Sequence, residues 1–162
     1  FSNKETLYRH VHETRAKHIN TMREQALEAL DRTYAPGLPP VEQIIRAFIH
    51  PFFVLKSENP DIWVAFIRTY FREIGTDVWR EVNATTLAPA IRRFTDVLHR
   101  SLPTTERSDI LFVLGLAIHG AVMAADADEA AIVGEGLAAD LTPDELEERL
   151  VRALTIIAQQ YS

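Results

Sequence analysis

Apolar residues recur every three or four positions along almost the whole of this sequence, which is the spacing of amphipathic α-helices. No segment shows the apolar–polar alternation that is typical of a strand. The 162 residues include 47% hydrophobic and 25% charged side chains, a composition that supports a buried core and differs from that of a disordered chain. The pattern therefore predicts an all-α fold of six helices, which form one domain over residues 1–162.

Capping signals and helix breakers set the expected boundaries. Ser2 with Glu5, and Thr142 with Glu145, have the spacing of a capping box, in which the two residues bond each other's backbone amides. Pro51 lies inside the second apolar stripe and should bend that helix or end its regular hydrogen bonding. We expect helices to begin near residues 3, 40, 60, 78, 105 and 142, with a candidate interruption at 83–86 and a loop over 126–141.

Two helices carry patterns that predict how they are buried. The first, expected over residues 3–32, has a stripe of residues at helical spacing. The fifth is apolar almost all round from Ile110 to Ala125, so it must be covered on several sides. A second subunit and a central place in a monomeric core are both open as explanations. The stripe on the first helix consists of Leu7, Val11, His18, Met22, Ala26 and Leu30.

Charge and composition exclude several classes of protein. The chain has no cysteine, which removes disulfides, thiolate catalysis and thiolate metal sites. The formal net charge is −6, so the chain as a whole is not a nucleic-acid-binding surface. The apolar run that ends at Ala125 is short for a bilayer span and is closely flanked by charge. Because residues 1–5 are also polar, unlike a signal peptide, we expect a soluble, cytoplasmic protein without membrane contact.

Sequence motifs for catalysis or metal binding are also missing. There is no Gly-x-Ser-x-Gly, no phosphate loop and no His-Glu-x-x-His. A di-iron bundle needs two Glu-x-x-His pairs, and the nearest match is the single run Asp96–His99. We therefore expect no catalytic residues, no metal and no cofactor. The alternative is a helical-bundle enzyme or cofactor-binding protein, which a visible absorption spectrum and a metal analysis would reveal.

The opening residues, Phe1-Ser2-Asn3-Lys4-Glu5-Thr6-Leu7-Tyr8, carry a resemblance to a known family. They resemble the junction between the helix-turn-helix head and the long connecting helix of tetracycline-repressor (TetR) family regulators. The helix order that follows is similar to the ligand-binding and dimerisation body of that family. The resemblance implies that residues 1–33 are the connecting helix and that a DNA-binding head precedes Phe1. It also implies a transcriptional regulator, most often a repressor, with a small, largely apolar effector.

The resemblance further implies where the functional residues lie. Lys4 matches a position that often contacts a DNA phosphate, and a solvated lysine in the first helical turn is the alternative. The family's effector pocket lies among the middle helices and the fifth helix, where ordinary core packing is the alternative for each residue. The implied lining consists of Phe48, Phe52, Trp63, Phe66, Tyr70, Phe94, Phe112 and His119.

The last two helices of this family usually pair with their copies in a second subunit to form a four-helix bundle. The resemblance therefore implies a homodimer, which agrees with the fifth helix being apolar on nearly every side. The residues expected in the interface are Leu111, Leu114, Ile118, Val122, Leu150, Leu154 and Ile157.

Overall fold

The computed structural model describes residues 4–125 and 141–161, without the side chains of Tyr70, Phe71 and Ala125. Within these ranges every regular element is helical, which confirms the all-α fold. The Ser2 cap and residues 126–140 of the predicted loop lie outside the described residues. The helices are α1 (Lys4–Tyr34), α2 (Val41–Glu58), α3 (Pro60–Glu73), α4 (Asp77–Val82), the π-helical η1 (Asn83–Leu87), α5 (Ala88–Ser101), α6 (Arg107–Ala125) and α8 (Pro143–Gln160).

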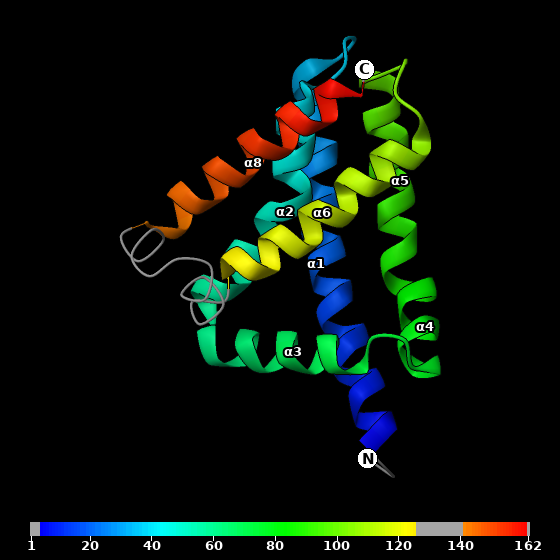
Figure 1. Cartoon of the computed structure of the whole chain (residues 1–162), viewed down its shortest axis with the longest axis vertical. Helices are drawn as coiled ribbons and strands as arrows, with labels where there is room; N and C mark the ends of the chain where they lie inside the picture. Colours follow the sequence, from blue (N-terminus) through cyan, green and yellow to red (C-terminus); the bar gives the residue numbers. More distant parts are fainter. Residues whose placement is uncertain (1–3, 126–140, 162) are drawn as a thin grey trace.

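The long helix α1 runs along the length of the molecule (Figure 1), and α2, α4, η1 and α5 pack against it. Near the N-terminal end, α3 lies across α1, while α4, η1 and α5 follow one another along its side (Figure 1). The helix α2 is central, because it contacts α1, α3, α5, α6 and α8. Its residues Ile44, Ile45, Phe48 and Ile49 are all fully buried and form the middle of the core.

The inward face of α1 differs from the predicted one near the N-terminal end, whereas Met22, Ala26 and Leu30 of the predicted stripe are partly buried against the core. Leu7 and Val11, expected to face the core, are exposed, and the buried stripe begins one residue later. A shift of one residue rotates a helix face by about 100°. The error arose because the true stripe mixes apolar and polar side chains, so the apolar pattern alone did not identify it. The buried residues of α1 are Tyr8, His12, Ala16, Ile19, Arg23 and Leu27.

Pro51 does not end α2, which continues to Glu58. Proline has no N–H, so it cannot donate the usual helical hydrogen bond to the carbonyl of Ala47. The carbonyl of the next residue, Phe48, accepts a hydrogen bond from Nε of Arg23 on α1 at 2.8 Å. The region around the proline is thus tied to the neighbouring helix by a buried side chain.

The candidate interruption at 83–86 is a π-helical segment, which joins α4 to α5 without a break in the helical path. A π segment accommodates an extra residue in a turn and is frequent at functional sites. Asn20 of α1 donates a hydrogen bond from Nδ2 to the carbonyl of Thr86 at 2.6 Å. Arg9 of α1 pairs with Glu81 of α4 at 2.8 Å. The α4–η1 segment is therefore fastened to α1 at two points.

The last helix, α8, begins with the predicted capping box. The Thr142 hydroxyl accepts from the Glu145 amide at 3.2 Å, and the Glu145 carboxylate accepts from the Thr142 amide at 2.8 Å. Against α6, the helix comes so close that a Cβ added to Gly120 would lie 2.8 Å from Cδ1 of Leu150. The absence of a side chain at Gly120 thus permits this close approach of the two helices.

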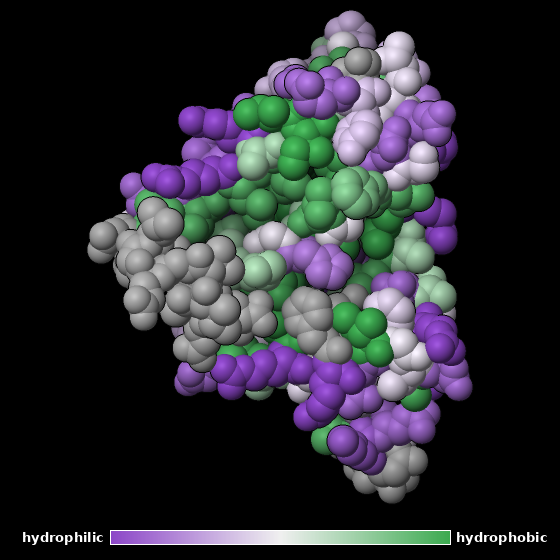
Figure 2. Space-filling model, in the orientation of Figure 1, coloured by the Kyte–Doolittle hydropathy of each residue, from purple (hydrophilic) through white to green (hydrophobic). Residues whose placement is uncertain are grey.

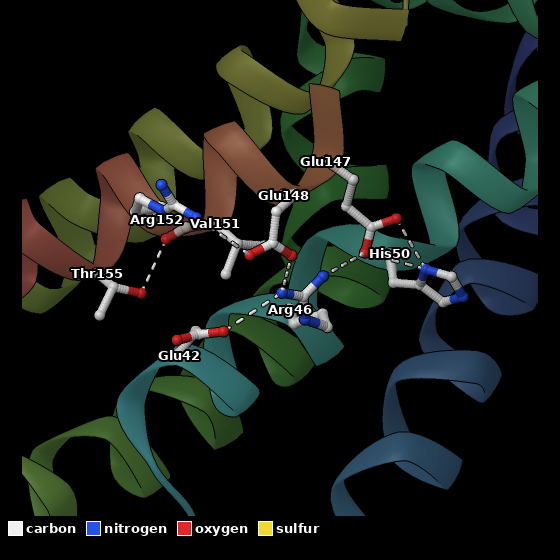
Figure 3. Close-up of polar contacts among 8 residues, drawn as sticks. All are labelled: Glu42, Arg46, His50, Glu147, Glu148, Val151, Arg152 and Thr155. Atoms are coloured by element: carbon white, nitrogen blue, oxygen red, sulfur yellow. Dashed lines mark hydrogen bonds and ion pairs between the residues drawn. The ribbon is translucent and has the colours of Figure 1, made fainter. Parts of the chain in front are cut away.

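An ionic network joins α8 to α2 (Figure 3). Arg46 of α2 pairs with Glu148 of α8 at 2.5 Å and with Glu42 of its own helix at 3.3 Å. The buried carboxylate of Glu147 lies 3.0 Å from Nδ1 of His50 and 3.9 Å from Arg46. Burying a carboxylate without a partner is costly in free energy. The contacts with His50 and Arg46 offset this cost for Glu147.

Apolar side chains remain on the outer faces of α6 and α8. Phe112 is 55% exposed, and Leu116 and Met123 lie four and eleven residues further along on the same side of α6. Hydrophobic surface gathers over these two helices on the face seen in Figure 2. By length and composition, Arg107–Ala124 is apolar enough to cross a membrane, at a mean hydropathy of 1.4. In the structure, however, α6 packs against α2, α5 and α8.

Candidate functional site

A mainly apolar cavity lies between α1, the α4–η1 segment, α2, α3 and α6. Its cavity volume is about 40 Å³, and the surrounding hollow measures about 560 Å³ when space open to solvent is included. In this conformation it is narrow, so a ligand larger than a few water molecules requires its walls to move apart. Its lining consists of Tyr8, His12, Ala16, Ile19, Arg23, Phe52, Phe66, Ile67, Trp79, Val82, Asn83, Thr86, Leu87, Ile118 and Val122.

Aromatic rings form one side of the cavity. Phe66 of α3 lies 4.8 Å from the ring of His12, which in turn lies 4.1 Å from Tyr8. Trp63 packs behind this wall, with its ring 5.6 Å from Phe52 and 5.8 Å from Phe66. Rigid aromatic walls with a few polar groups are typical of small-molecule pockets.

Arg23 is a completely buried cation on the cavity wall. Its guanidinium carbon lies 4.0 Å from the centre of the Phe48 ring and 5.1 Å from that of Phe52. The faces of aromatic rings are electron-rich and attract a cation. Together with the Nε hydrogen bond to the Phe48 carbonyl, these contacts hold the guanidinium in one orientation.

His12 is the second titratable side chain in the lining. Burial lowers the pKa of His12 to about 4, and the negative charge of Glu73 acts in the opposite direction. The imidazole is therefore neutral near pH 7. At that pH it offers one N–H donor and one acceptor nitrogen rather than a charge.

We predict that His12 makes the protein less stable as the pH falls. The unfolded chain takes up a proton with a pKa near 6.5, whereas the folded protein does so only near 4. The contribution of His12 to the free energy of unfolding is therefore fully present above pH 6.5 and is lost as the pH falls to 4. The loss is about 2 kcal/mol after allowance for partial solvation. Urea denaturation at pH 7.5 and pH 4.5 measures the loss.

The matched variants are His12→Phe and His18→Phe, because His18 lies exposed on the same helix. Between the two pH values, the free energy of unfolding of the His12 variant should fall by about 2 kcal/mol less than that of the unmodified protein. The free energy of unfolding of the His18 variant should fall as much as that of the unmodified protein. An identical pH dependence in all three proteins would contradict the assignment.

A second hollow lies between the N-terminal half of α1 and α3. It is more open, with about 1140 Å³ of empty space, and its lining includes Leu7, Val11 and Ile62. Lys4 also lines this groove, at the exposed start of α1. The predicted contact of Lys4 with a DNA phosphate stays a prediction.

The structure brings together only some of the residues expected in the pocket. Phe52 and Phe66 line the cavity, whereas Phe48, Phe94 and Trp63 are buried in the core beside or behind it. Phe48 and Phe94 contact each other with ring centres 4.9 Å apart. The side chain of Tyr70 lies outside the described residues. Phe112 and His119 are exposed on the outer side of α6 and are absent from the lining.

The residues expected in a dimer interface differ in their exposure. Leu111 is exposed, while Leu114, Val122 and Leu154 are buried within the subunit and so cannot reach a partner. Ile118, Leu150 and Ile157 are partly buried and pack against the subunit's own core. The apolar surface available to a partner is rotated from the predicted one. It consists of Leu111, Phe112, Leu116 and Met123 on α6, with Ile156 and Tyr161 on α8.

Sequence reasoning missed the contribution of α1 and η1 to the cavity. Tyr8, His12 and Arg23 lie four and eleven residues apart, which places them on one side of a helix. This spacing could have indicated a shared buried face on α1. Polar residues on a helix are, however, ordinarily expected to face solvent. Asn83 and Thr86 had no such signal, because the π segment that turns them inward is not visible in the sequence.

The described part of the chain is thus an all-helical body with a mainly apolar cavity beside its longest helix. Residues 46–155, more than half of the chain, match the family described as the tetracyclin repressor-like C-terminal domain. The chain therefore belongs to the TetR family, as its opening residues suggested. Neither a curated protein nor a solved structure matches the chain.

Proposed function

We propose that this chain is the effector-binding and dimerisation body of a TetR-family transcriptional regulator that acts as a repressor. The observation that carries the proposal is the cavity, because one of its walls is α1, the helix that leads to the N-terminal end. The family match supports a regulator with a ligand-binding body. In this proposal the effector is small and largely apolar, and DNA is bound by a helix-turn-helix N-terminal to Phe1.

The contacts of α1 support a route from the cavity to the N-terminal end. Val82, Asn83 and Thr86 line the cavity, and the same segment is tied to α1 by the Asn20–Thr86 and Arg9–Glu81 contacts. An effector that widens the narrow cavity would move α4 and η1, and α1 would follow. Such an effector would favour the wider conformation and so shift the population of α1 orientations.

The proposal includes a homodimer formed by α6 and α8. The apolar side chains on the outer faces of these helices support it, since water-exposed apolar patches of this kind commonly mark interfaces. In a symmetric dimer the same patch on each copy meets its counterpart. Movement of α1 in both copies would then change the distance between the two DNA-binding heads.

The cavity can be tested through tryptophan fluorescence. The chain has two tryptophans, and Trp79 lines the cavity while Trp63 packs behind it. A Trp63→Phe protein reports Trp79 alone. Titration with toluene, cyclohexanol and octan-1-ol should change the Trp79 emission and raise the unfolding temperature for at least one compound.

Two further variants locate the binding. In the Trp63→Phe background, Phe66→Ala should weaken that binding by about tenfold or more, because the lost ring is part of the wall. Phe112→Ala removes the same side chain from the exposed face of α6 and should leave it unchanged. Equal effects of the two changes, or no response to any of the compounds, would contradict the cavity as the effector site.

A further inference from the structure

Three aromatic side chains separate the cavity from the open groove between α1 and α3. Tyr8, His12 and Phe66 line both hollows. Their rings follow one another, with centres 4.1 Å apart from Tyr8 to His12 and 4.8 Å apart from His12 to Phe66. The cavity and the groove are therefore neighbours that meet at one layer of side chains.

The two hollows differ in size and in enclosure. The cavity, at about 40 Å³, holds no more than a few water molecules. The groove, at about 580 Å³, lies within the range of about 300–1,000 Å³ that is typical of small-molecule sites, but it is more open to solvent. A ligand that extends from the groove into the cavity would combine the room of the first with the apolar surroundings of the second.

The layer between the hollows includes a side chain away from the centre of the core. Phe66 is partly buried, and its helix, α3, packs closely against α2 among the described helices. The contacts of α2 with α1, α6 and α8 do not involve α3. A rotation of the Phe66 ring, with a small shift of α3, would therefore join the hollows and leave these central contacts in place.

The polar groups available to a ligand are at the groove end. The cavity wall is mainly aliphatic and aromatic, and Arg23 in it is fully buried with Nε bonded to the Phe48 carbonyl. A polar group is costly to place in apolar surroundings without a partner, so the polar end of a ligand should stay in the groove. The charged residues that line the groove are Lys4, Arg15, Asp61, Arg72 and Glu73.

We propose that the groove and the cavity form one effector site for a long-chain amphiphile, whose apolar end passes Phe66 into the cavity and whose polar end stays in the groove. This inference rests on the proposed function of the cavity and adds the shape and the chemical class of the effector. The exposed side chains of Leu7, Val11 and Ile62 supply apolar surface for the part of the chain that lies in the groove.

Straight-chain alcohols measure the length of the site: butan-1-ol, hexan-1-ol, octan-1-ol and decan-1-ol. In the Trp63→Phe protein, Trp79 lines the cavity but not the groove, so its emission reports the arrival of the apolar end. The dissociation constant should fall by about threefold for each added CH₂ group up to decan-1-ol, because each group leaves water. A site confined to the cavity would give no further gain after the shortest alcohols.

Two doubly substituted proteins, both in the Trp63→Phe background, locate the rest of the chain. Val11→Ser with Ile62→Ser removes apolar surface from the groove alone. It should weaken decan-1-ol binding by about tenfold and leave butan-1-ol binding within about twofold. The control, Leu38→Ser with Ile74→Ser, removes two exposed side chains that line neither hollow and should leave both dissociation constants unchanged.

Equal binding of decan-1-ol by the two doubly substituted proteins would overturn the joined site but leave the cavity as an effector site. A dissociation constant that stops falling after butan-1-ol would have the same meaning, whether or not the substituted proteins fold. A rise in the unfolding temperature with decan-1-ol but no change in Trp79 emission would place the ligand in the groove alone and overturn the inference. Failure of all four alcohols to bind would overturn both the inference and the proposed function.

Discussion

Phe48→Ala is expected to lower the free energy of unfolding by about 3–5 kcal/mol. Phe48 has no exposed surface, and its ring packs between Arg23 on α1 and Phe94 on α5. Alanine would remove the ring and leave a cavity in the middle of the core, which the helices cannot fully close because α2 contacts five others. The change would also take away the aromatic face beneath the Arg23 guanidinium.

Urea denaturation followed by circular dichroism measures this loss, at one protein concentration for every variant. The control is Leu38→Ala, which removes an exposed side chain from the turn between α1 and α2. That change should alter the free energy of unfolding by less than about 0.5 kcal/mol. A loss below about 1 kcal/mol for Phe48→Ala would mean that this position is not at the centre of a close-packed core.

The second large effect concerns association. Phe112→Glu combined with Leu116→Glu should raise the dissociation constant of the proposed homodimer by at least about a hundredfold. Both side chains are exposed in the subunit and lie on one side of α6, so their replacement leaves the core intact. Two negative charges on each copy would then face each other across a twofold axis, where they repel and must lose water.

Sedimentation equilibrium distinguishes the subunit of 18.4 kDa from a particle of twice that mass. The control, Thr104→Glu, adds a negative charge in the exposed turn before α6 and should leave the dimer unchanged. Circular dichroism should show the same helix content in all variants. A doubly substituted protein that keeps the dimer mass would exclude this face of α6 as the interface.

Features that depend on neighbours in the chain were predictable. The capping box at Thr142, the helix start at Pro60 and the breaks between helices act within a few residues, so the sequence contains all of their causes. The all-α fold follows from the same kind of information, because helical spacing persists through every long segment. Of the eight residues that the family resemblance placed in the pocket, Phe52 and Phe66 line the cavity.

The orientation of α6 could not be predicted in this way. A helix that is apolar almost all round fits its surroundings in several rotations, and the pattern does not choose between them. The structure turns Leu114 and Val122 into the subunit and Phe112 outward. Residues expected to meet a partner are therefore in the core, and one expected in the pocket is on the surface.

The sequence by itself determined the all-α fold, the helix start at Pro60, the capping box at Thr142 and the family, since these depend on local spacing, capping and a short junction. Only the tertiary structure decided that Arg23 and His12 of α1 share a cavity with Phe66 of α3 and the π segment. The reason is that a buried polar side chain is tolerated only through contacts with distant parts of the chain. For Arg23, these contacts include the carbonyl and the ring of Phe48, 25 residues further along the chain.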